Sequence, residues 1–153
     1  MRERSVEHAT FVLERNYDAS PDRVFAAWSD PDAKARWFDG SEGEVEFDFR
    51  VGGRERRRGT LPNGRAYTFQ GLYQDIVPAR RIVFTYDMVL DETRISVSVA
   101  TVQFRPERAG TRLVFTEQAA FLDGHEMPGQ RERGMGSLLD ALAAELRSNR
   151  AGA

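Results

Sequence analysis

The stretch that decides the fold is Pro128 to Arg150, PGQRERGMGSLLDALAAELRSNR, near the end of the 153-residue chain. Apolar residues recur in it at every third or fourth position, the spacing that places side chains along one face of a helix. These residues are Met135, Leu138, Leu139, Leu142 and Leu146. Burying each one is worth roughly 1.5–3 kcal/mol, whereas ordering each backbone residue costs ~1–2 kcal/mol. We therefore predict a long helix that is stable only against a partner surface.

Segments with strand character occupy most of the chain before this helix. In them, apolar and polar residues alternate, so that one face of each strand is buried and the other is solvated. Turn signals such as Gly52-Gly53 and Asn63-Gly64 separate the segments, and no crossover helix lies between the central ones. We therefore predict an antiparallel sheet of about six or seven strands. The predicted strands are Thr10–Tyr17, Glu44–Val51, Arg54–Arg58, Arg65–Ile76, Ile82–Tyr86, Arg94–Phe104 and Thr111–Glu117.

Two short helices are predicted between the first and second strands. Ser20-Pro21-Asp22 and Asp30-Pro31-Asp32 each combine a capping side chain, a proline suited to the first helical position and an aspartate at the positive end of the dipole. Pro31 would interrupt the hydrogen bonds of one continuous helix. The predicted class is therefore α+β, with two short helices after the first strand and a long C-terminal helix across the sheet.

Composition indicates one ordinary globular domain over residues 1–153, with disordered ends at about 1–8 and 149–153. Hydrophobic residues make up 41% of the chain, and its net charge of -2 offers no positive field for nucleic acid or an acidic membrane. The first eight residues carry charges of both signs and are not expected to form a signal peptide. No apolar run approaches the ~20 residues that span a bilayer. Without cysteine, the chain fits a reducing compartment, and we expect a cytoplasmic protein.

The predicted strand at Arg54–Arg58 is rich in arginine. Strand parity places Arg54, Arg56 and Arg58 on one face, and Glu55 and Arg57 on the other. We interpret it as a solvated edge strand protected by charge. In the alternative interpretation, one or more of these arginines points into a cavity and binds an anionic group.

The run from Gly71 to Tyr86, GLYQDIVPARRIVFTY, resembles the central hairpin of the bacterial proteins similar to the activator of heat-shock protein 90 ATPase homologue. Those proteins belong to the START-like, or SRPBCC, helix-grip superfamily. The resemblance extends from about Phe11 to Arg147 and implies a curved sheet wrapped around the C-terminal helix. Further matches are Ser20-Pro21 with Val24–Trp28, Asp30-Pro31 before Trp37-Phe38, Val51–Gly53, and Gly110–Leu113.

Family members often carry a Gly-Trp pair at the start of the long helix, where this chain has Gly134-Met135. Methionine is flexible and polarizable and fills irregular spaces that tryptophan fills rigidly. The difference implies either a roomier cavity or a simple repacking of the core.

The resemblance implies a cavity between the sheet and the long helix, covered by the short helices and the loop before the long helix. Strand parity and helix face select the candidates for its lining. They are Trp28, Trp37, Phe38, Phe47, Phe49, Arg56, Tyr67, Phe69, Tyr73, Phe84, Tyr86, Val97, Val99, Met135, Leu138, Leu139 and Leu142.

Polar candidates for such a cavity are few. They are Arg54, Arg56, Tyr86, Glu117 and His125, of which Tyr86, Glu117 and His125 are also the candidate catalytic residues. The chain has two histidines and no cysteine, and it lacks a phosphate-binding loop, a nucleophile elbow and a zinc-binding helix motif. We therefore expect no metal and no cofactor.

Three functions remain open at this stage. The leading hypothesis is a protein, monomeric or homodimeric, that binds a small apolar or amphipathic molecule without catalysis. The second is an enzyme similar to the polyketide cyclases or aromatases of the superfamily, which would need Arg56, Tyr86, Glu117 or His125 to converge. The third is a co-chaperone-like module that binds a protein partner and activates a heat-shock protein ATPase, as the family name implies.

Overall fold

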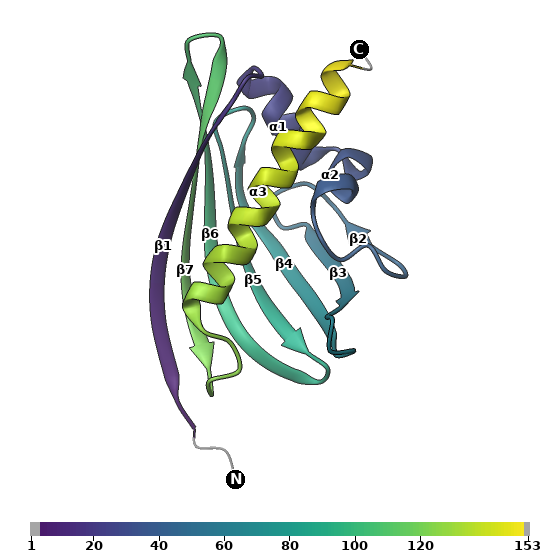
Figure 1. Cartoon of the computed structure of the whole chain (residues 1–153), viewed down its shortest axis with the longest axis vertical. Coiled ribbons are helices and arrows are strands. Elements are labelled where there is room, and N and C mark those ends of the chain that lie inside the picture. The colour runs from purple at the N-terminus through teal and green to yellow at the C-terminus, as the bar shows by residue number, and fades with distance from the viewer. Residues whose placement is uncertain (1–3, 152–153) are drawn as a thin grey trace.

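A curved sheet and a long helix dominate the computed structural model, which describes residues 4–151 and the side chains of residues 4–148 (Figure 1). Over this part, the chain forms seven strands and three helices. In chain order they are β1 (Val6–Tyr17), α1 (Pro21–Ser29), α2 (Pro31–Trp37), β2 (Glu46–Phe47), β3 (Arg54–Thr60), β4 (Ala66–Val77), β5 (Arg81–Leu90), β6 (Thr93–Glu107), β7 (Gly110–Leu122) and α3 (Pro128–Ala151).

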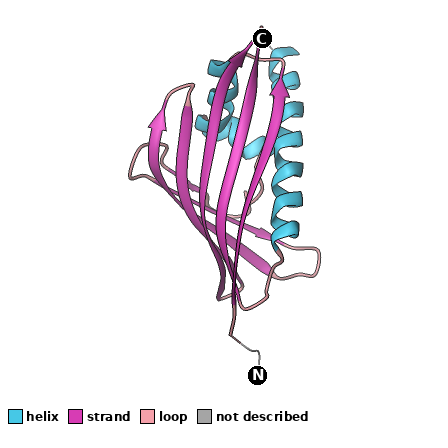
Figure 2. Ribbon diagram, turned by 90° about the vertical axis from the view of Figure 1, so that its left-hand side faces the viewer, coloured by secondary structure: helices cyan, strands magenta, loops and turns pink. Residues whose placement is uncertain are grey.

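The strands form one sheet in the order β1-β7-β6-β5-β4-β3-β2. Every neighbouring pair is antiparallel, and β7 lies between β6 and the first strand of the chain. The helices all lie on one side of the sheet, with α3 crossing its concave face (Figure 2). This arrangement confirms the predicted α+β helix-grip fold. No helix between residues 4 and 151 is both long and apolar enough to cross a membrane.

Two caps fix the short helices where the sequence predicts them. Ser20 Oγ accepts from the Arg23 amide at 3.2 Å, and Asp30 Oδ2 accepts from the Ala33 amide at 2.9 Å. The amide of Asp30 also donates to Ala26 O at 2.8 Å. Asp30 therefore ends α1 and begins α2.

The apolar face of α3 packs on the sheet as predicted. Leu139 and Leu142 have no exposed surface, and Met135 and Leu146 are also buried. The hydroxyl of Tyr17, at the end of β1, donates to Leu139 O at 2.8 Å. Since this carbonyl lies mid-helix, the bond fixes the position of α3 along the sheet.

The ordered part of the chain is longer than predicted at both ends. β1 begins at Val6 rather than Thr10, because β7 continues to Leu122 and pairs with residues 6–8. α3 likewise continues through residue 151. Residues 6–8 and 149–151 therefore belong to regular elements, and residues 4 and 5 precede β1. Residues 1–3 and 152–153 of the predicted disordered ends lie outside the described residues.

The strand predicted at Glu44–Val51 is wrong over most of its length. Only Glu46 and Phe47 pair with β3, and the chain then turns through an Arg50 amide bond to Asp48 O and a Gly53 amide bond to Arg50 O. A Cβ atom at Gly53 would lie 2.0 Å from Asp48 O, so the turn closes too tightly for a side chain there. Alternation of apolar residues is therefore not sufficient evidence for a strand here.

The face predicted for β6 is also wrong. Met88 pairs with Ser96 and Val89 with Arg94, which leaves Ile95 as an extra residue in a bulge. Ile95 and Ser96 are both buried, and the inward face continues from Ser96. Val97 and Val99, which were predicted to point into the cavity, are instead on the outer face and are 46% and 38% exposed.

Candidate functional site

A cavity of about 470 Å³ lies between the inner face of the sheet and the N-terminal half of α3. Aromatic side chains form much of its wall. These are Phe38, Tyr67, Phe69, Phe84, Tyr86 and Phe115. Aliphatic residues of β5, β6 and α3 complete the apolar lining. These are Met88, Leu90, Ile95, Met135 and Leu138, with Leu61 from the β3–β4 turn.

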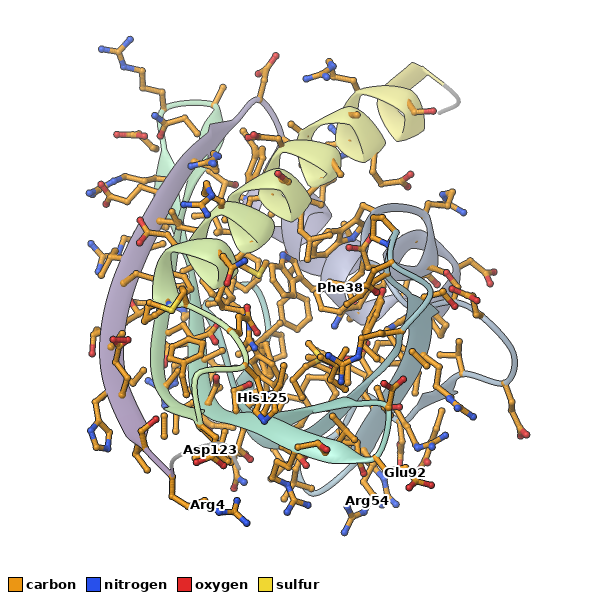
Figure 3. The ribbon with its side chains drawn as sticks, turned by 60° about the horizontal axis from the view of Figure 1, so that its bottom comes forward. Arg4, Phe38, Arg54, Glu92, Asp123 and His125 are labelled. Atoms are coloured by element: carbon orange, nitrogen blue, oxygen red, sulfur yellow. The ribbon has the colours of Figure 1, made fainter. Side chains whose placement is uncertain are left out.

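Polar residues gather where the cavity meets solvent. They are Asp39, Asn63, Arg65, His125, Glu126, Gln130 and Arg131. Figure 3 views this end of the molecule, with Phe38 beside α2 and His125 in the loop between β7 and α3. The cavity is therefore apolar inside and polar at its mouth, an arrangement typical of small-molecule sites.

Arg131 is the most buried of these polar residues and connects α3 to the sheet. Its Nη1 donates to the Tyr86 hydroxyl at 2.9 Å and to Glu117 Oε2 at 3.3 Å. Its Nη2 donates to Ser96 Oγ at 2.8 Å. Glu117 Oε2 also accepts from the hydroxyls of Tyr86, at 2.7 Å, and Ser98, at 2.8 Å. We call Arg131, Glu117, Tyr86, Ser96 and Ser98 the Arg131 cluster.

The charge states of the Arg131 cluster follow from its burial. Burial and the neighbouring Glu117 carboxylate raise the pKa of Tyr86 far above its ordinary value, so this phenol is neutral. Burial alone would lower the pKa of Arg131, but Tyr86, Glu126 and Glu117 raise it instead, so the guanidinium is charged. Glu117 Oε1 is buried and has no hydrogen-bond partner among the described side chains.

The opposite edge of Arg131 faces the loop before α3. Its Nε and Nη2 donate to Glu126 Oε2 and Oε1 at 2.9 and 2.5 Å, as a two-pronged ion pair. The Glu126 side chain is 20% exposed, whereas that of Glu117 is fully buried. Arg131 therefore has one carboxylate behind it in the sheet and another at the mouth of the cavity.

A second buried ionic group lies around Glu55 on β3. Lys34 Nζ of α2 donates to Glu55 Oε1 at 2.8 Å, the Tyr73 hydroxyl donates to the same oxygen at 2.5 Å, and Arg57 Nε donates to Glu55 Oε2. Lys34, Glu55 and Arg57 are each at most 2% exposed. We call these four residues the Glu55 cluster.

Burial and neighbouring charges shift the pKa values of Lys34 and Glu55. Burial lowers the pKa of Lys34, although Glu55 opposes this. Burial would raise the pKa of Glu55, but the charges of Lys34 and Arg57 and the bonds from Lys34 and Tyr73 outweigh it and lower the pKa. Arg57 Nη1 is buried without a partner among the described residues.

Phe38 contacts both the cavity and the Glu55 cluster. Its ring lines the cavity, and the ring centroid lies 4.5 Å from Lys34 Nζ and 5.6 Å from Arg57 Cζ. No charged member of the Glu55 cluster lines the cavity. The two clusters therefore differ in their access to a ligand.

The structure brings together some of the predicted site residues. Phe38, Tyr67, Phe69, Phe84, Tyr86, His125, Met135 and Leu138 line the cavity. Another group packs in the core or against it instead: Trp28, Trp37, Phe47, Phe49, Tyr73, Leu139 and Leu142. Arg54 and Arg56 are exposed, as are Val97 and Val99, and Figure 3 shows Arg54 pointing away from the cavity.

The predicted parity of the arginine strand is confirmed, but the strand is not a solvated edge strand, because β3 pairs with both β2 and β4 and its inward face is buried. Arg54, Arg56 and Arg58 are exposed as expected, while Glu55 and Arg57 point inward. Because Arg56 is on the outer face, it does not converge with Tyr86 and Glu117. Arg57 points inward, but none of the arginines of β3 lines the cavity, so the alternative in which one of them binds an anionic group there is wrong.

Arg131, Glu126 and Ser96 are not among the site residues predicted from the sequence. A signal for Arg131 exists, because it lies four residues before Met135 and so extends the buried stripe of α3 by one turn. Ser96 would follow from extending the inward face of β6 backwards from Val102. Glu126 lies in a loop and has no such periodic signal.

Metal-ligating residues do not gather in the part of the chain that the structure describes. No group of three or more His, Cys, Asp or Glu side chains within residues 4–148 is placed to hold an ion.

Comparisons with known proteins agree with this architecture. The sequence pattern of a family described as "Activator of Hsp90 ATPase homolog 1-like protein" matches residues 18–147. A search of curated proteins finds no match. Among solved structures, Mll3558 from Rhizobium loti is 48% identical, with a TM-score of 0.87 over 92% of this chain and 99% of that one. An uncharacterized protein from Rhizobium leguminosarum is 45% identical, with a TM-score of 0.89 over 95% and 99%.

A more distant structure shares the fold alone. CalU16 from Micromonospora echinospora is 22% identical, with a TM-score of 0.69 over 95% of this chain and 86% of that one. The helix-grip architecture is therefore common to chains that differ in most of their residues.

Proposed function

This chain belongs to the Activator of Hsp90 ATPase homolog 1-like family, within the SRPBCC superfamily, and we propose that it binds a small amphipathic molecule between its sheet and α3. The observation that carries the proposal is the cavity of about 470 Å³ with aromatic walls and a polar mouth. Cavities of ~300–1,000 Å³ hold small molecules in proteins. The apolar part of the ligand lies among the rings, and its polar end lies near Arg131.

The space beside Met135 supports this proposal. Met135 lines the cavity together with Tyr86, and the α3 residues Gly134 and Leu138 line it as well. The first turn of α3 contacts Tyr86 through Arg131, and the following turns line the cavity with Gly134, Met135 and Leu138. A thioether side chain at this position leaves room that an indole would occupy.

The geometry favours binding over the cyclase-like alternative. The Tyr86 hydroxyl already donates to Glu117 and accepts from Arg131, so its proton and its oxygen are both engaged. Arg56 is outside the cavity, and the remaining candidate, His125, lies at the mouth. A general acid or base needs a proton that can reach the substrate, and the Tyr86–Glu117 pair instead holds Arg131 in place.

The co-chaperone-like alternative rests on the family description. The exposed valines of β6, Val97 and Val99, would be its natural contact points on the outer face. Val97 there lies beside the polar residues Arg54, Gln70 and Arg94, so the surface around it is mixed rather than continuously apolar. We therefore place the ligand site in the cavity.

A neutral fluorophore such as N-phenylnaphthylamine tests the proposal. We expect saturable binding at one site, with blue-shifted emission, because the rings of the cavity exclude water from the dye. Met135→Trp should weaken this binding about tenfold or more, since the indole fills the cavity. Val99→Trp, which adds the same chromophore on the outer face, is the matched control and should bind as the unchanged protein does. Absence of saturable binding, or equal binding by Met135→Trp, would overturn the proposal.

A further inference from the structure

The sheet holds one side of the Arg131 guanidinium through three of its strands. Tyr86 on β5, Ser96 on β6 and Glu117 on β7 accept three of its hydrogen bonds. The rings of Tyr86 and Phe121 also lie against it, with centroids 5.6 and 5.3 Å from Cζ. Arg131 would therefore keep its orientation without any contact from the loop between β7 and α3.

The remaining edge of Arg131 is occupied by a side chain of that loop. Glu126 accepts from Nε and Nη2 with both carboxylate oxygens, at 2.9 and 2.5 Å. Both residues line the cavity, and Glu126 is the more exposed of the two, at 20% against 8%. The Glu126 carboxylate thus occupies a position at the cavity edge that a carboxylate on a small molecule could also fill.

Charge balance selects the kind of ligand that can use this edge. Glu117 alone neutralises Arg131, so Glu126 adds a second negative charge beside one guanidinium. A ligand anion added to both would place three carboxylates around a single cation. Exchange of Glu126 for another carboxylate leaves the buried charge unchanged and leaves no buried donor unpaired. An alcohol in the same place would satisfy at most part of the two-pronged edge.

We propose that the cavity takes a monocarboxylate with an apolar body, and that its carboxylate replaces Glu126 on Nε and Nη2 of Arg131. The inference rests on the proposed function, because it names the chemical class of the ligand for that same cavity. Aryl acids and fatty acids share this chemistry, and both fit walls that are partly aromatic and partly aliphatic. Glu126 is then a built-in occupant that the ligand must displace.

Calorimetric titration with matched pairs tests the exchange. The pairs are naphthylacetate with naphthylethanol, and decanoate with decanol, so that each acid has a neutral partner of the same body. Glu126→Gln should raise the affinity for one or both acids about tenfold, because the competing charge is gone. The same variant should leave the affinity for the alcohols unchanged. The acid that gains identifies an aryl or an alkyl body.

Two further variants keep the test specific. Glu132→Gln removes an exposed negative charge at the position directly after Arg131 on α3, where the side chain does not bond Arg131, and it should leave the acid affinity unchanged within about twofold. Arg131→Lys keeps a positive charge but loses the two-pronged edge, so the preference for acid over alcohol should fall about tenfold. The fold of each variant is checked by its unfolding transition.

The outcomes separate the inference from the proposed function. Equal changes for acid and alcohol in Glu126→Gln, or an equal gain in Glu132→Gln, would overturn the inference. Suppose that the alcohols bind, that Met135→Trp weakens their binding, and that the acids do not bind in any variant. In that case the inference fails and the proposed function stands. If no compound of either pair binds and the neutral fluorophore does not bind, both fail.

Discussion

The Arg131 cluster and the Glu55 cluster are both buried ion-pair networks, but their charges are arranged in opposite ways. In the Glu55 cluster, two cations share one carboxylate, and every charged member is sealed from solvent. Arg131 instead has two carboxylates, one fully buried and one partly exposed at the cavity. No charged member of the first arrangement lines the cavity, whereas in the second Glu126 lines it and can be released while Glu117 still neutralises Arg131. Burial alone therefore does not distinguish a structural cluster from a site that can exchange a ligand.

The largest effect should come from Glu55→Ala. This change leaves Lys34 and Arg57 buried without a counter-charge, and we expect a loss of about 3–5 kcal/mol in the free energy of unfolding. Urea titration measures the loss. Arg56→Gln, at the exposed neighbouring position, should change the same quantity by less than ~0.5 kcal/mol. A similar stability for both variants would contradict a structural role for the Glu55 cluster.

A smaller loss should follow from Glu117→Ala. Arg131 keeps Glu126 as a partner, so we expect about 2–3 kcal/mol, mainly from the unpaired hydroxyls of Tyr86 and Ser98 and the weakened hold on Arg131. Glu126→Ala should cost ~1 kcal/mol or less, because its carboxylate is partly hydrated. Urea titration should show that the loss in the free energy of unfolding decreases from the Glu55 variant to the Glu117 variant and then to the Glu126 variant. An inverted order would refute the proposed difference between the clusters.

Substitution of the two buried tyrosines should lower stability in both cases but change ligand affinity in only one. Tyr73→Phe and Tyr86→Phe each remove a hydroxyl that bonds to a buried carboxylate, and each should cost about 1.5 kcal/mol. Only Tyr86 lines the cavity and contacts Arg131, so only Tyr86→Phe should alter the affinity for a ligand. Thermal unfolding and dye titration on the same samples make the comparison. Equal effects on affinity would show that the Glu55 cluster also reaches the ligand.

The smallest effect should be confined to acid pH. The pKa of Glu55 is lower in the folded chain than its ordinary value of about 4.3. The unfolded chain therefore binds this proton first, so the stability due to Glu55 is complete above about pH 4.3 and is lost as the pH falls through the lower folded value. Glu55→Gln should lack this part of the acid dependence, as measured by urea titration at several pH values, and Arg56→Gln should keep it.

The parts of the fold with local signals were predictable. Ser20 and Asp30 act through bonds to amides three residues away, and the stripe of α3 consists of five apolar residues between Met135 and Leu146, so both signals lie within short stretches of sequence. Glu44–Val51 failed because the tight turn at Gly53 depends on backbone atoms, which the alternation of side chains does not record. The wrong face of β6 has a related cause, because a bulge changes parity without changing composition.

The site was predictable in its apolar part and only in part among its polar residues. The rings of β4 and β5 alternate regularly and point inward together, as Tyr67, Phe69, Phe84 and Tyr86 do. Tyr86 of β5 was a candidate partner of Glu117, but Arg131 and Ser98 come from α3 and β6 and are brought to it only by the tertiary fold. A buried carboxylate can be suspected from one strand, but its counter-charge cannot be located there.

The bulge at Ile95 has a consequence for how the chain tolerates changes in length. Ile95 lines the cavity while the next residue, Ser96, bonds Arg131, and a regular strand could not turn two consecutive side chains to the same face. Deleting Ile95 would either remove the bulge or shift the register of β6 against β5. In the second case Val97 and Val99 would turn inward and Ser96 and Ser98 outward. Loss of one aliphatic residue would then replace the serine hydroxyls that bond Arg131 and Glu117 by apolar side chains.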